Sequence, residues 1–155
     1  MFQYRYRVAA FCLAVLSCCY APWALAAQFE TVGDYVIHYN AVNTSMLQPE
    51  VAKNYEIVRS KNRALLNIAV RKKGAEATAP DTAASAQVKV SVANLNGQLQ
   101  QVNMREIREG EAIYYIGVFN ISNAETLDFK IEVAPEMKGT PHAFKFRQEF
   151  FTTQP

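Results

Sequence analysis

Apolar and polar side chains alternate along several short segments of this chain, and this period of two constrains its fold most. The clearest case is residues 127–133, where Leu127, Phe129, Ile131 and Val133 alternate with polar residues. Successive side chains of an extended strand point to opposite faces, so this pattern predicts a strand with one buried face. The same alternation recurs in five further segments: 34–42, 64–71, 88–92, 102–104 and 144–150.

Residues between these segments supply the turns and one helix. Asn96-Gly97 predicts a tight hairpin, because both residue types tolerate positive φ. Residues 49–56 begin with Pro49, which suits the first helical position, and predict one or two helical turns. Residues 74–85 are rich in alanine and threonine, contain Pro80, and predict a loop inside one domain.

Residues 113–121 are apolar on both faces, which is typical of a central strand. Together these segments predict an all-β fold, an antiparallel immunoglobulin-like β-sandwich of about seven strands with one short helix. An eight-stranded barrel is the alternative architecture.

The N-terminal segment has the layout of a secretory signal peptide. Arg5 and Arg7 precede an apolar run over residues 8–16, and Ala24-Leu25-Ala26 offers small residues for a signal peptidase. We therefore expect residues 1–26 to be cleaved and residues 27–155 to form one periplasmic domain. The alternative is a lipoprotein anchored through Cys18.

Cleavage after Ala26 removes 26 of the 155 residues and leaves 129. The cysteines Cys12, Cys18 and Cys19 all leave with the signal, so the domain is expected to fold without a disulfide. Because the signal contains two arginines and no acidic residue, the mature domain has 14 basic and 14 acidic residues and a net charge near zero. Such a balance argues against nucleic acid as a partner, and we expect no transmembrane segment in the mature protein.

One basic cluster in a predicted turn is the candidate binding site. Its members provide three cations, a hydroxyl and an amide: Arg59, Ser60, Lys61, Asn62 and Arg63. Arginine forks and exposed backbone amides hold phosphates and carboxylates, so the cluster predicts contact with an anionic ligand or a partner protein. The alternative is a solvated turn whose charges pair with acids such as Glu56.

Soft metal ligands are present but not clustered in sequence. They are His38, Met46, Met104, Met137 and His142. Imidazole and thioether groups suit copper, yet no two of these residues stand two or four positions apart. We therefore predict no metal site and no cofactor, and keep periplasmic copper binding as the alternative function.

Catalytic patterns are equally sparse. No Gly-x-Ser-x-Gly elbow is present, and Glu109 and Glu111 flank Gly110 in a predicted turn where they are expected to stay in water. An enzyme, such as a hydrolase, is the third hypothesis for the function, after an interaction module and a copper-binding protein. Five tyrosines could supply a recognition surface, although alternation assigns at least half of them to the core: Tyr35, Tyr39, Tyr55, Tyr114 and Tyr115.

Four stretches resemble a family of small exported proteobacterial proteins, domain of unknown function 4426. They are residues 35–40 (Tyr-Val-Ile-His-Tyr-Asn), 47–52 (Leu-Gln-Pro-Glu-Val-Ala), 59–68 (Arg-Ser-Lys-Asn-Arg-Ala-Leu-Leu-Asn-Ile) and 105–115 (Arg-Glu-Ile-Arg-Glu-Gly-Glu-Ala-Ile-Tyr-Tyr). The resemblance implies export and an all-β fold, and it implies no activity. The function we predict is a non-catalytic binding or interaction module of the cell envelope, with an unknown envelope protein or anionic ligand as partner.

Overall fold

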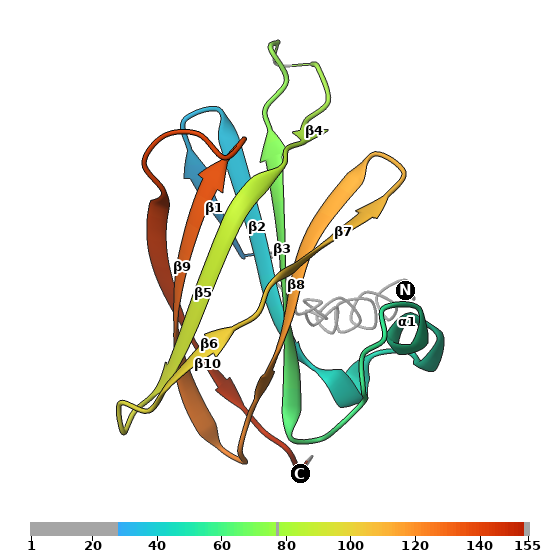
Figure 1. The fold of residues 1–155 in the computed structure, drawn as a ribbon, viewed down its shortest axis with the longest axis vertical. Helices are drawn as coiled ribbons and strands as arrows, with labels where there is room; N and C mark the ends of the chain where they lie inside the picture. The colour runs from blue at the N-terminus through green and yellow to red at the C-terminus, as the bar shows by residue number, and fades with distance from the viewer. Residues whose placement is uncertain (1–27, 77, 154–155) are drawn as a thin grey trace, which may run out of the picture.

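The computed structural model describes residues 28–76 and 78–153, which form ten strands, one 3₁₀ turn and one short α-helix (Figure 1). The elements follow in chain order: β1 (Gln28–Val32), β2 (Tyr35–Asn43), η1 (Thr44–Met46), α1 (Pro49–Asn54), β3 (Arg63–Lys72), β4 (Thr82–Ala83), β5 (Ala86–Asn94), β6 (Leu99–Val102), β7 (Arg105–Glu109), β8 (Ala112–Asn120), β9 (Glu125–Pro135) and β10 (His142–Phe150). The predicted signal peptide with its three cysteines lies outside the described residues.

The strands form two antiparallel sheets. Sheet A has the order β1-β2-β3-β8-β7, with β4 paired to the end of β3, and sheet B has the order β10-β9-β5-β6. The prediction of a mainly antiparallel β-protein with one short helix is confirmed. The central position predicted for residues 113–121 is also confirmed, because β8 lies between β3 and β7.

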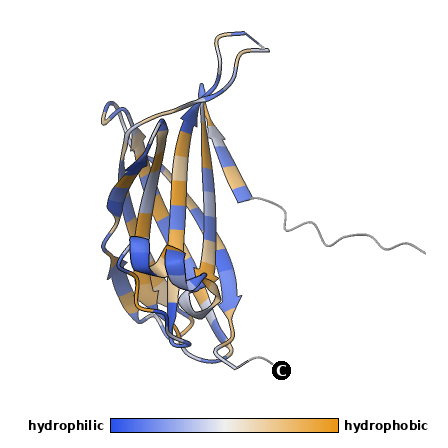
Figure 2. Cartoon of the chain, turned by 90° about the vertical axis from the view of Figure 1, so that its right-hand side faces the viewer, coloured by the Kyte–Doolittle hydropathy of each residue, from blue (hydrophilic) through white to orange (hydrophobic). Residues whose placement is uncertain are grey.

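The inward faces of both sheets enclose one apolar core. Leu127, Phe129, Ile131 and Val133 are at most 4% exposed, as their alternation predicts. From sheet A, Phe119 packs edge-on against Phe129 with 5.3 Å between ring centroids. Figure 2 shows the resulting bands of hydrophobic and hydrophilic residues along the strands. Burial of these aliphatic and aromatic side chains supplies the main driving force for association of the sheets.

Three features differ from the sequence prediction, which counted about seven strands. First, β1 precedes the first predicted strand and joins β2 through a two-residue turn in which Gly33 has a φ of 55°. Second, residues 82–83 of the predicted loop pair with β3. Third, residues 102–104 were predicted as part of one strand, but they contain the crossing between the sheets. Strand β6 of sheet B ends at Val102, and the chain then enters sheet A as β7, which begins at Arg105.

The hairpin predicted at Asn96-Gly97 exists, but its geometry was predicted wrongly. Only Gly97 has a positive φ, of 79°, whereas Asn96 does not. The side-chain oxygen of Asn94 accepts hydrogen bonds from the backbone N–H groups of Asn96 (3.1 Å) and Gln98 (3.0 Å). The loop is therefore held by an asparagine side chain rather than by two left-handed residues.

The connection between β2 and β3 crosses the outer face of sheet A, the face turned away from sheet B. Its helix α1 begins at Pro49 as predicted. It ends at Asn54, two residues before the predicted end; beyond it Glu56 adopts a φ of 53° and the N–H of Ile57 donates to the carbonyl of Ala52. Ala52 and Ile57 pack with Leu65 of β3 and with β8 in a second, smaller apolar cluster. Among the described residues, no helix has the length and apolar character needed to cross a membrane.

Candidate functional site

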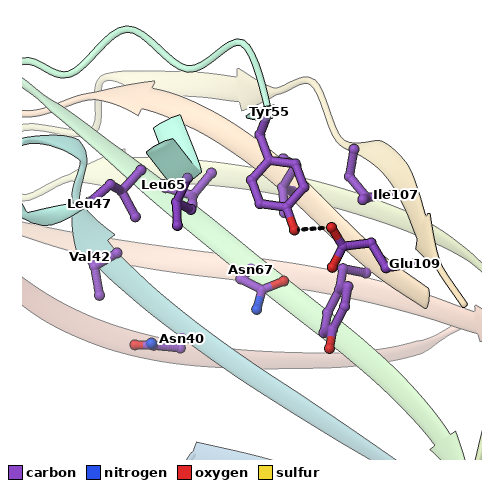
Figure 3. A pocket seen from close by; sticks show the side chains of 11 residues that line it. Asn40, Val42, Leu47, Tyr55, Leu65, Asn67, Ile107 and Glu109 are labelled. Carbon is purple, nitrogen blue, oxygen red and sulfur yellow. Dashed lines mark hydrogen bonds between the residues drawn. The ribbon is translucent and has the colours of Figure 1, made fainter. Parts of the chain in front are cut away.

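A pocket of about 300 Å³ lies on the outer face of sheet A, beside α1 (Figure 3). Strands β2, β3, β7 and β8 form its base, and the segment that carries α1 closes one side. The lining residues are Asn40, Val42, Leu47, Val51, Tyr55, Leu65, Asn67, Ile107, Glu109, Tyr114 and Ile116. We call this the outer-face pocket.

The pocket follows from the apolar second face of β8. Tyr114 and Ile116 point away from the core, and Leu65 of the neighbouring strand β3 adds to the same surface. A sheet face of this kind must be covered to be stable in water. Because α1 is only six residues long, it covers part of this surface and leaves the pocket beside it.

Asn67 places an amide among these apolar side chains. It lies on β3, opposite Asn40 of β2 on one side and Ile116 of β8 on the other. Its side-chain oxygen Oδ1 is buried and has no hydrogen-bond donor. An unpaired buried acceptor costs about 1–3 kcal/mol, so a donor that reached this covered oxygen would recover part of that cost.

A hydrogen bond between Tyr55 and Glu109 joins the end of the helical segment to the edge strand β7. The Tyr55 hydroxyl donates to Oε1 of Glu109 at 2.6 Å (Figure 3). This bond is the main cause that raises the pKa of Tyr55 above its usual value, with burial adding to it. Glu109 forms no salt bridge with any residue that the structure describes.

The predicted anion-binding residues form an ordered turn outside the outer-face pocket. The Arg59 guanidinium donates to the carbonyl of Ser45 at 2.8 Å. The backbone of Ser60 exchanges two hydrogen bonds with the buried hydroxyl of Thr44, at 2.9 and 3.1 Å.

Farther along the turn, the N–H of Asn62 donates to Ser60 Oγ at 3.1 Å, and its carbonyl accepts from the backbone of Ile121. The side chains of Lys61 and Arg63 are exposed. Glu56, the acid suggested as a partner for this turn, pairs with Arg105 at 3.9 Å instead, and the exposed Lys61 and Arg63 agree with the alternative of a solvated turn. Anion binding by the turn stays a prediction.

The candidate copper ligands are spread over the fold. His38 lies on β2 of sheet A and His142 on β10 of sheet B. Met104 packs against the core, while Met46 and Met137 are exposed. Within residues 28–76 and 78–153, no three His, Cys, Asp or Glu side chains come together in a group that could hold a metal ion.

Two of the five candidate tyrosines reach the outer-face pocket. Tyr115 is 5% exposed, and Tyr35 and Tyr39 pack against the core, whereas Tyr55 and Tyr114 line the pocket. Sequence reasoning missed Asn67, and it did not predict that Glu109, which is exposed as expected, also lines the pocket. Asn67 could have been found in the sequence as a polar amide on the outward face of a strand whose two faces are both largely buried.

The sequence matches the family described as domain of unknown function (DUF4426) over residues 29–153. A solved DUF4426 family protein from Pseudomonas aeruginosa is 34% identical, with a TM-score of 0.70 over 83% of this chain and 97% of that chain. No curated protein matches.

Two solved structures of FetP from a uropathogenic Escherichia coli strain share the fold. One, of FetP expressed in the periplasm, is 7% identical with a TM-score of 0.57, over 81% of this chain and 93% of that chain. The other, a copper-bound FetP variant, is 9% identical with a TM-score of 0.55, over 84% and 93% of the two chains. The 34% identity and the match over residues 29–153 establish that this chain belongs to the DUF4426 family.

Proposed function

We propose that this chain is an exported, non-catalytic binding protein of the cell envelope, which holds a small ligand in the outer-face pocket. The observation that carries the proposal is the buried, unpaired oxygen of Asn67 inside an apolar pocket. Ligand sites combine apolar walls with a few polar groups that fix the orientation of the ligand. The outer-face pocket has this composition.

Export is supported by the signal-like segment before the domain. Within the part of the chain that the structure describes, the first strand begins at Gln28, two residues after the predicted cleavage at Ala26. The periplasmic expression of FetP, which shares the fold, is consistent with this location. The intact mass of protein recovered from cells tests the proposal, because cleavage leaves 129 residues. An acylated mass beginning at Cys18 would instead support the lipoprotein alternative.

The strand order supports an immunoglobulin-like topology as the finer description of the fold. The order β2-β3-β8-β7 corresponds to strands A, B, E and D of that fold. The order β10-β9-β5 corresponds to G, F and C, and β6 takes the place of C′. In this description the outer-face pocket lies on the exposed side of the ABED sheet.

A non-catalytic role is supported by the placement of the titratable groups. His38 lies beside Phe29 and His142 beside Phe144, with 6.2 and 6.0 Å between ring centroids, so each imidazole has an aromatic ring as its neighbour. The copper that accompanies one FetP structure belongs to that protein, and its 9% identity carries only the fold to this chain. Titration with Cu(I) and Cu(II) tests the alternative of copper binding. Binding tighter than micromolar would favour that alternative.

A fragment library screened by ¹H–¹⁵N NMR tests the pocket directly. Fragments that bind should shift the amide signals of Leu65, Asn67 and Tyr114 together. Val42→Phe should abolish these shifts, because Val42 lines the pocket and a phenyl ring there fills it. Val58→Phe is the matched control, since Val58 is 65% exposed and lies outside the lining. Equal shifts in both variants, or none in the unchanged protein, would overturn the proposal.

A further inference from the structure

We propose that the outer-face pocket selects a small primary amine, whose ammonium group is held by Glu109 and Asn67 and whose apolar body lies against the aliphatic walls. This inference rests on the proposed function and adds the chemical class of the ligand. It follows from the charge, the hydrogen-bonding groups and the size of the pocket.

The charge of the pocket favours a cation. Glu109 is the only ionisable carboxylate in the lining, and no Lys, Arg or His belongs to it. Oε1 of Glu109 accepts the Tyr55 hydroxyl, which leaves Oε2 for a second donor. Arg105, on the same strand, donates to the carbonyl of Tyr55 and pairs with Glu56 instead. The negative charge of Glu109 is therefore not neutralised by a described basic side chain.

The polar and aromatic groups of the lining suit an ammonium in two further ways. Asn67 Oδ1 is covered and has no donor, and an ammonium group, which has three donors and no acceptor, would pair with it once the Asn67 amide turns toward the pocket. The rings of Tyr55 and Tyr114 also line the pocket, and the face of a tyrosine ring attracts a cation. A carboxylate ligand would meet Glu109 and an unpaired acceptor, so the pocket disfavours anions.

The size of the pocket suits a small molecule. Its volume of about 300 Å³ lies at the lower end of the range typical of small-molecule sites. Leu47, Val51 and Ile107 give the walls their aliphatic character. A chain of about six carbons, ending in an ammonium group, fits this volume and its lining.

Isothermal titration calorimetry of the purified protein near pH 7 with hexylamine, 1-hexanol and hexanoate tests this inference. Hexylamine should bind with one site per chain, about tenfold or more tighter than hexanol, because a charge-assisted hydrogen bond adds to the apolar contact. Hexanoate should show no binding. A tripeptide with N-terminal leucine should bind more weakly than hexylamine, and tighter peptide binding would overturn the assignment to a small molecule.

Two variants with the same change of charge locate the ammonium site. Glu109→Gln should weaken hexylamine binding about tenfold or more and leave hexanol binding unchanged. Glu111→Gln is the matched control, because Glu111 is exposed in the same turn and outside the lining. Circular dichroism checks that both variants fold.

The outcomes separate this inference from the proposed function. Equal affinities for hexylamine and hexanol, or equal effects of the two variants, would overturn the amine assignment while leaving the pocket as a binding site. Absence of binding by all three probes, together with an empty fragment screen, would overturn both proposals.

Discussion

Replacing Asn67 by leucine should stabilise the domain and at the same time weaken ligand binding. The substitution removes a buried acceptor that has no donor, and thereby recovers about 1–3 kcal/mol of unfolding free energy. Leucine is also close to asparagine in shape, and it joins the apolar cluster around Leu65 and Ile116. For a domain of this size the midpoint of thermal unfolding should rise by roughly 4–12 °C.

Urea unfolding followed by far-UV circular dichroism measures this change, since Trp23, the only tryptophan of the sequence, stands in the predicted signal. Asn40→Leu is the matched control. Asn40 is the cross-strand neighbour of Asn67 but is exposed, so its replacement should change stability by less than about 0.5 kcal/mol.

The two effects of Asn67→Leu have opposite signs, which separates a binding role from a structural one. If Asn67 is retained for binding at the expense of stability, its replacement by leucine should give a more stable protein with lower affinity for hexylamine. Loss of stability in Asn67→Leu, relative to Asn40→Leu, would refute the reasoning, because it would mean that the Asn67 amide is satisfied in the folded protein.

Three further predictions concern the core, the link between the sheets and the end of α1. Phe129→Ala should lower the unfolding free energy by about 3–5 kcal/mol, because Phe129 is fully buried between the sheets; chemical denaturation measures the loss. Tyr115→Phe should cost about 1–3 kcal/mol, because the Tyr115 hydroxyl accepts from the buried backbone N–H of Ala86 at 2.7 Å. The same hydroxyl donates to Glu106 and lowers the pKa of that carboxyl in the folded state. The stability that this hydrogen bond contributes is therefore fully present above pH 4.5, the ordinary pKa of Glu106. It is lost as the pH falls through the lower pKa of the folded state. Denaturation at a series of pH values should therefore show the difference between the native protein and Tyr115→Phe shrinking below pH 4.5, and a constant difference would contradict the assignment. Glu56→Gly should stabilise by about 1 kcal/mol, because Glu56 has a φ of 53° that glycine adopts without strain; an unchanged or lower thermal midpoint would contradict this reading of the helix end.

Local alternation predicted the core strands because burial on one face leaves a direct mark on the sequence. The four apolar residues from Leu127 to Val133 illustrate this, and so does the two-faced strand β8. Strand β1 left no such mark, because it lies at the sheet edge and its Phe29 is 58% exposed. Its signal was instead the Gly33-Asp34 turn, which is a hairpin motif.

The switch from β6 to β7 could not be predicted from alternation, because a strand that leaves one sheet for another keeps its local pattern. Close approach of these segments depends on Gly117 of β8. A Cβ atom there would lie 2.6 Å from Val102 and 2.5 Å from the sulfur of Met104. Nothing near Gly117 in the sequence announces that contact.

The outer-face pocket was predictable only in part. The sequence marked Tyr55 and Tyr114 as candidates for recognition, and the apolar outward face of β8 implied that something covers it. The contact of Tyr55 with Glu109 joins residues 54 positions apart, so it depends on the register of the sheet. Glu109 and Glu111 are both exposed, as the sequence predicted, but the place of Glu109 in the pocket lining beside Tyr55 was not predicted.

The central claim is that the outer-face pocket binds a small primary amine. The most direct test is to measure intermolecular nuclear Overhauser effects between hexylamine and the methyl groups of the labelled protein. The claim predicts contacts from the hexyl chain to the methyl groups of Leu65, Ile107 and Ile116, which line the outer-face pocket. Contacts confined to exposed methyl groups such as that of Met46, or the absence of any contact at saturating amine, would contradict it.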